Sequence, residues 1–86
     1  MNKITVGQFL NFTNIYVPIY IENEFQIGDC WNGSVDSLLH TLRQDQLNCE
    51  ILYIRNVDGG HRKDFEKDNC AIVLGIADED FEKYFR

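Results

Sequence analysis

The amino-acid sequence predicts a single α+β domain over residues 1–86, with an antiparallel sheet of about four strands and short helices on one face. The first observation is the segment Asn69–Ala77, which contains no charged residue and no polar alternation. A strand that is apolar on both faces is typical of a central strand covered on both sides. The second observation is the order of the patterns along the chain: helix, two strands, helix, two strands, helix. This αββαββα order fits a mainly antiparallel sheet best, and the chain length leaves room for one hydrophobic core.

The first element is expected to be a short helix over Ile4–Phe12. Thr5 and Gln8 have the spacing of a capping box. In that motif the hydroxyl accepts from one free backbone N–H, and the amide side chain reaches back to another. The candidates to bury one face of this helix are Phe9, Leu10 and Phe12.

A hairpin is expected to follow the first helix. Ile15–Glu22 alternates as a strand, with its isoleucines on one face. Because proline cannot donate a hydrogen bond to a ladder, Pro18 predicts that this strand lies at an edge of the sheet or contains a bulge. Glu24–Trp31 is expected to return as the second strand, with Phe25 and Ile27 facing inward.

The middle of the chain predicts a second helix and a third strand. Asn32-Gly33 is a strong turn signal, and Ser34 is placed to cap the helix that follows. An amphipathic stripe at helical spacing supports this helix: Val35, Leu38, Leu39 and Leu42. Residues 43–46 are expected to be a polar connection, and Leu47–Val57 a strand.

The final third contains the central strand and a last helix. Asp58–Asp68 is a charged stretch that is expected to form a loop. One face of the central strand carries small residues, so a large group could pack closely against it: Ala71, Val73, Gly75 and Ala77. Asp78 is expected to cap a last helix that carries three aromatic residues on one face: Phe81, Tyr84 and Phe85.

Charge and composition limit the classes of partner. The net charge is −6 and the isoelectric point is about 4.6. Phosphate binding requires a basic face, so the sequence argues against direct binding of nucleic acid and of anionic membranes. It is compatible with a protein partner that has a basic surface. No apolar run in the sequence is long enough to span a bilayer, and no secretory signal pattern is present. A cytoplasmic location is therefore expected.

Catalytic and metal-binding patterns are weak. Structural zinc sites have paired ligands a few residues apart, and the three cysteines and two histidines show no such pairs. A Cys–His nucleophile would also require an orienting group and an oxyanion pocket, which no motif indicates. We therefore expect no enzyme activity, no catalytic residue, no metal and no cofactor, and we expect free thiols at Cys30, Cys49 and Cys70.

Two groups of residues are candidates for protein binding. The first is an acidic group: Asp78, Glu79, Asp80 and Glu82, joined by Asp64 and Glu66. Acids are also favourable at a helix start, which is the alternative explanation for this run. The second group is Tyr16 and Tyr20, on the Pro18 face of the predicted edge strand. Exposed aromatic residues often anchor partners, but these two could equally lie under a helix.

The chain resembles small acidic proteins encoded by phages and mobile elements of Gram-positive bacteria. The resemblance lies in the capped helix around residues 4–10, the hydrophobic hairpin and the leucine-rich helix at residues 34–42. It implies an accessory or inhibitor role, including the anti-CRISPR type, in which a small acidic protein occupies the nucleic-acid groove of a nuclease. It carries over no functional residue.

The resulting hypothesis is a non-enzymatic protein-binding module. It would act through an acidic surface as an inhibitor of a nucleic-acid-binding or CRISPR-Cas defence protein. Two alternatives remain open, namely a small oligomeric structural or accessory subunit and a small enzyme without a recognisable motif.

Overall fold

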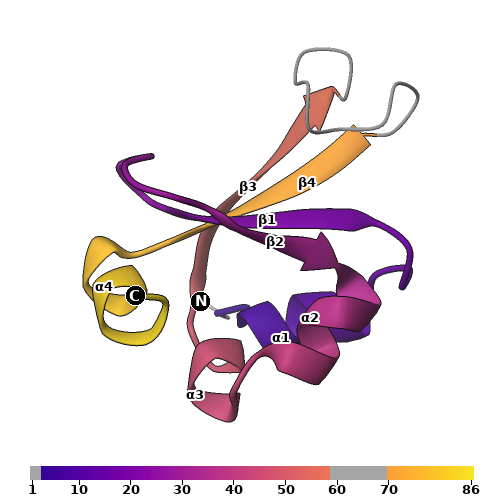
Figure 1. Cartoon of the computed structure of the whole chain (residues 1–86), viewed down its shortest axis with the longest axis horizontal. Helices are drawn as coiled ribbons and strands as arrows, with labels where there is room; N and C mark the ends of the chain where they lie inside the picture. Colours follow the sequence, from indigo (N-terminus) through magenta and orange to yellow (C-terminus); the bar gives the residue numbers. More distant parts are fainter. Residues whose placement is uncertain (1–2, 59–69) are drawn as a thin grey trace.

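A four-stranded mixed sheet lies at the centre of the fold, and its strands follow the spatial order β2-β1-β4-β3 (Figure 1). The computed structural model describes residues 3–58 and 70–86. The strands are β1 (Pro18–Asn23), β2 (Trp31–Ser34), β3 (Ile51–Asp58) and β4 (Cys70–Ile76). The helices are α1 (Val6–Asn11), α2 (Val35–Thr41), α3 (Gln44–Leu47) and α4 (Asp78–Tyr84). The α+β class predicted from the sequence is confirmed.

The pairing of the strands is only partly antiparallel. β1 pairs with β2, and β3 with β4, in antiparallel fashion, whereas β1 and β4 are parallel. The expectation of an antiparallel sheet is therefore wrong for the central pair. Its physical cause is burial: β4 is apolar on both faces and occupies an interior position, where its neighbour β1 is also largely buried.

The position of Pro18 corrects a second expectation. β1 lies between β2 and β4, so it is neither an edge strand nor bulged at Pro18. Pro18 is the first residue of β1, opposite Ser34. At the start of a strand the missing N–H interrupts no continuing ladder, so proline is tolerated there. The edges of the described sheet are β2 and β3.

The second strand also begins later than the sequence predicts. Phe25 and Ile27 do not face inward but are 63% and 51% exposed, in the connection between β1 and β2. The predicted turn at Asn32-Gly33 lies inside β2. A tertiary contact overrides the turn signal there, because the Trp31 indole N–H donates to the Phe85 carbonyl at 2.7 Å and its ring meets the Phe85 ring edge-on.

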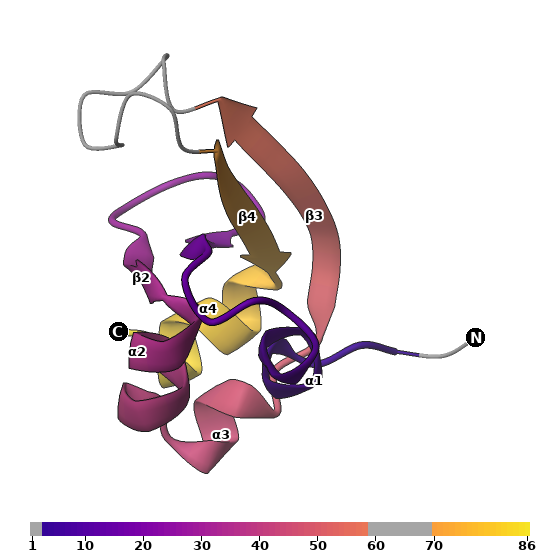
Figure 2. The same cartoon turned by 90° about the vertical axis from the view of Figure 1, so that its right-hand side faces the viewer.

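The hydrophobic core lies between the sheet and the helices, which gather on one side of it (Figures 1 and 2). Leu38, Leu42, Leu74 and Ile76 are buried, whereas Leu39 is only partly buried. The Thr5–Gln8 capping box is present at the start of α1. The buried core comes from α1, α2 and α4, the two central strands and residues that flank α3 and α4: Val6, Leu10, Ile19, Ile21, Val35, Leu38, Leu42, Cys49, Leu74, Ile76, Phe81 and Phe85.

Candidate protein-interaction site

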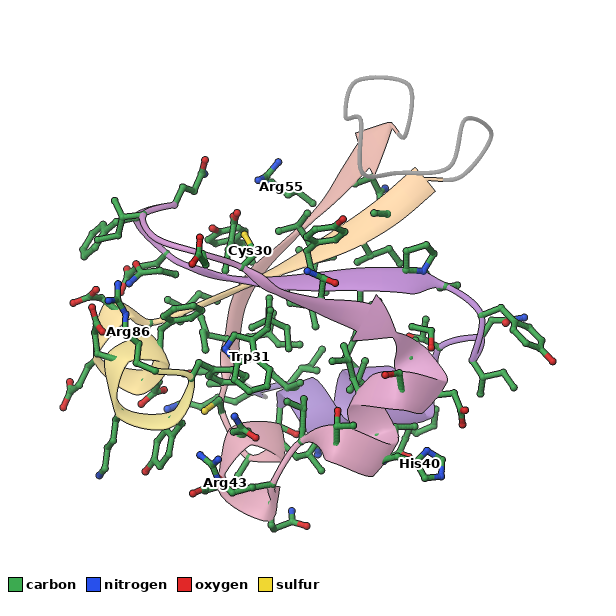
Figure 3. All side chains as sticks on the ribbon, in the orientation of Figure 1. Cys30, Trp31, His40, Arg43, Arg55 and Arg86 are labelled. Carbon is green, nitrogen blue, oxygen red and sulfur yellow. The ribbon has the colours of Figure 1, made fainter. Side chains whose placement is uncertain are left out.

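A buried carboxylate network occupies the face of the sheet opposite the helices. Glu22 on β1 is 5% exposed. The Tyr53 hydroxyl donates to its Oε2 atom, and the Arg55 guanidinium donates to Oε1 at 3.0 Å and to Oε2 at 3.3 Å. Figure 3 shows Arg55 and Cys30 on this side of the sheet, with Trp31 on the helix side. The network therefore connects β1 and β3 across the intervening strand β4.

Gly75 makes this crossing possible. It lies opposite Tyr53 in the β3–β4 ladder, and a Cβ atom at Gly75 would be 2.1 Å from the Tyr53 ring. Only glycine leaves room for the ring to lie flat over β4 and reach Glu22. The prediction that a large group packs on the small-residue face of this strand is confirmed by this contact.

The hydrogen bonds of the Glu22 network stabilise the protonated forms of Tyr53 and Arg55. Burial, followed by the hydrogen bond to Glu22, raises the pKa of Tyr53 to about 12, so the phenol is protonated at neutral pH. The hydrogen bond to Glu22 also raises the pKa of Arg55. Every buried polar side-chain atom in the described residues has a hydrogen-bond partner. A carboxylate bound by a phenol and a guanidinium links strands β1 and β3.

The first predicted acid, Asp78, belongs to the fold as much as to the surface. Its Oδ1 atom accepts from Asn23 Nδ2 at 2.6 Å, and its backbone N–H donates to Glu24 Oε2 at 2.8 Å. These two bonds attach the start of α4 to the end of β1. Asp78 is the first residue of α4 and not its cap, because Ala77 holds the N-cap position and no side chain caps this helix. As an acid in the first turn it has the helix-start role that was the alternative explanation for the acidic run.

The other acids of α4 are more accessible. Glu79 is exposed, Asp80 is partly exposed, and Glu82 pairs with Arg86 at 2.7 Å. Asp80 and Asp45 line one shallow hollow of about 230 Å³, where Asp45 is an addition that sequence reasoning missed. We call Asp45, Asp78, Glu79, Asp80 and Glu82 the acidic end. The predicted Asp64 and Glu66 lie outside the described residues.

The acidic end changes the chemistry of a neighbouring thiol. Cys49 is a free cysteine that lines the hollow between Asp45 and Asp80, and it is 4% exposed. Burial, then Asp80 and Asp45, raise the pKa of the Cys49 thiol to about 11. A thiol is nucleophilic as the thiolate, so this environment suppresses reactivity.

The two predicted tyrosines are not brought together. Tyr16 precedes β1 and is 81% exposed. Tyr20 lies within β1, is 8% exposed and packs with Ala71 and Val73. Of the pair, Tyr16 alone presents its ring to solvent as an anchor would.

The sequence reasoning missed an exposed apolar surface beside α1 and β3. Phe12 is 91% exposed, Ile4 49%, and Leu52 and Ile54 46% each. Two shallow hollows of about 540 and 320 Å³ share Lys3 and Ile4, the first beside Phe12 and the second beside Leu52 and Ile54. We call Ile4, Phe12, Leu52 and Ile54 the apolar edge. The alternation of Leu52 and Ile54 was visible in the sequence, but the position of β3 at the edge of the sheet was not.

The comparisons with known proteins add no relative: no family model, no curated protein and no solved structure matches the chain. No helix among the described residues is long and apolar enough to cross a membrane. Within residues 3–58 and 70–86, no cluster of three His, Cys, Asp or Glu side chains is arranged to hold a metal ion.

Proposed function

We propose that this chain is a non-enzymatic protein-binding module that acts on a partner with a basic surface. The observation that carries the proposal is the apolar edge, where Phe12 is 91% exposed and three aliphatic side chains are about half exposed. Exposed contiguous apolar side chains on a small domain are typical of interaction surfaces. They would supply the desolvated contact on which affinity depends.

The negative net charge of the chain supports a partner that has a basic surface. Within residues 59–69 the basic side chains balance the acidic ones in number: Arg62, Lys63 and Lys67 against Asp64, Glu66 and Asp68. The described residues therefore carry the whole net charge of −6. Three of their arginines are already paired with acids: Arg43 with Asp45, Arg55 with Glu22 and Arg86 with Glu82.

The partner class follows from this charge. An acidic module favours encounter with a basic surface, and a surface that binds nucleic acid is basic for the same electrostatic reason. An inhibitor of a nucleic-acid-binding protein, including a CRISPR-Cas protein as the resemblance implies, is the specific form of the proposal.

The proposal is tested by capture from a Gram-positive bacterial lysate on the immobilised chain, with the retained proteins quantified by mass spectrometry. We expect a basic nucleic-acid-binding protein to be retained and to be displaced by competing DNA or RNA. The matched control is an Ile4→Ser, Phe12→Ser variant, which keeps the charge and removes apolar contact, and which should retain less of it. The proposal is wrong if the wild type and this variant retain the same proteins equally, or if nucleic acid displaces none of them.

A further inference from the structure

Among the residues that the structure describes, the outer edge of β3 is unpaired over most of its length. β3 is the last strand in the order β2-β1-β4-β3, and among the described residues it pairs with β4 alone along its ladder. Figure 2 shows β3 curving past α1, with its distal half clear of the helices. A strand edge presents a row of backbone N–H and C=O groups that an extended chain can pair with.

The beginning of this edge is already paired with an extended segment. Thr5 forms an antiparallel bridge with Glu50, and the Ile51 N–H donates to the Ile4 carbonyl at 2.8 Å. The edge thus pairs with the segment before α1 at its first residues, and no other described residue pairs with it beyond them.

Side chains beside the unpaired part of this edge favour an apolar occupant. Leu52 and Ile54 line one hollow of about 320 Å³ together with Ile4. Ile54 lies opposite Leu74, a core residue, so it is on the helix side of the sheet, whereas Tyr53 and Arg55 are engaged with Glu22 on the other side. Apolar side chains at alternate positions of an added strand would enter this hollow, because successive side chains of a strand point to opposite faces.

We propose that β3 binds an extended segment of a basic protein by strand addition, with alternate apolar residues of that segment seated on Leu52 and Ile54. This inference rests on the proposed function and specifies how the partner is held. A second copy of the chain is the less favoured occupant, since each copy carries a net charge of −6 and like charges repel. The same net charge favours an occupant whose own net charge is positive.

The probe is a display library of random peptides of about ten residues, the upper length of an ordinary strand, selected on the immobilised chain. We expect selected peptides to carry apolar residues at alternate positions and a positive net charge. Ile54→Lys should weaken their binding at least about tenfold, the equivalent of one or two lost favourable contacts. Ile15→Lys is the matched control, because it makes the same change at an isoleucine of similar exposure outside the apolar edge, 45% against 46% for Ile54, and should leave the affinity within about twofold.

A scan of N-methylated peptides tests the backbone contact without altering the protein. An N-methyl group removes one N–H donor, and in an added strand only alternate N–H groups face the neighbouring strand. We therefore expect losses of about tenfold or more at every second position and small effects between them. Loss at consecutive positions, or at none, would overturn the proposal whatever the behaviour of the protein variants.

The remaining outcomes separate this inference from the proposed function. Sedimentation that shows a dimer which Ile54→Lys dissociates would assign the edge to a second copy and overturn the proposal. If the lysate partner is captured equally by the wild type and by Ile54→Lys, the binding function stands and the strand-addition mode is wrong. Failure to select any peptide that binds Ile54→Lys more weakly than Ile15→Lys would also reject strand addition.

Discussion

At the scale of single residues, Gly75 is the position where one added methyl group has the largest predictable effect. A Cβ atom there would lie 2.1 Å from the Tyr53 ring, so the ring would have to leave Glu22. We expect Gly75→Ala to lower the free energy of unfolding by about 1–3 kcal/mol, the usual range for overpacking. Urea unfolding measures this loss. In a Tyr53→Ala background the same substitution should cost less, and an equal cost in both backgrounds would show that the clash is not its cause.

Tyr53 also predicts a dependence of stability on alkaline pH. Its pKa is raised to about 12 in the folded chain from an ordinary value of 10.0, so folding stabilises the protonated phenol. This contribution is fully present below about pH 10 and is lost as pH rises towards about pH 12. Unfolding free energies measured across this range should fall more steeply for the wild type than for Tyr53→Phe. Parallel pH profiles for the two proteins would contradict the prediction.

At the scale of elements, α3 shows why one helix was missed. Residues 43–46 are polar, so their pattern contains no apolar stripe that indicates a helix. The helix is instead held by Gln46, which is 1% exposed. Its Oε1 atom accepts from the Arg43 N–H at 2.7 Å, and its Nε2 atom donates to the Tyr84 carbonyl at 2.9 Å. Gln46 is buried because it bonds a carbonyl that is distant in the sequence. A buried polar residue of this kind leaves no hydrophobic periodicity from which a helix could be predicted.

The elements that were predicted correctly have local causes. The capping box of Thr5 and Gln8 and the Ser34 cap of α2 are formed by neighbours in the chain, and β4 was recognised from its own composition. The parallel β1–β4 pairing and the exposure of Leu52 and Ile54 depend on which strands meet after folding. The sequence therefore predicted most elements but could not assign the sheet edge, and the apolar edge was missed with it.

Gln46 gives a test at the element scale with a control on the same helix. Gln46→Ala removes two partly buried hydrogen bonds, one from the Arg43 N–H at the N-cap of α3 and one to the Tyr84 carbonyl at the end of α4, so we expect a loss of about 1–3 kcal/mol in unfolding free energy. Gln44→Ala has the same intrinsic helix propensity change but alters an exposed contact with Asn48, and should change stability by less than about 0.5 kcal/mol. Equal losses in thermal or urea unfolding would mean that the buried amide contributes little.

At the scale of the whole molecule, charge and apolar contact are expected to have separate kinetic effects. Long-range attraction accelerates encounter, whereas desolvated contact slows dissociation. The acidic end and the apolar edge involve different elements, α3 and α4 in one case and α1 and β3 in the other. Changes at the acidic end should therefore alter the association rate constant, and changes at the apolar edge the dissociation rate constant.

Charge reversal of the acidic end tests this separation with the partner identified by capture. Glu79→Lys with Asp80→Lys is the informative pair, because these acids form no ion pair with another described residue, whereas Asp78 helps to attach α4 to β1. We expect slower association and a weaker dependence on salt, since the screening length falls from about 10 Å at 0.1 M to about 3 Å at 1 M.

The matched control is Asp29→Lys with Asp36→Lys, which changes net charge equally at two other exposed positions. Surface-plasmon kinetics at several salt concentrations should show a larger decrease in association rate for the first pair. Equal decreases would mean that net charge alone steers the partner, and unchanged rates for both pairs would refute electrostatic steering and leave the apolar edge as the source of binding.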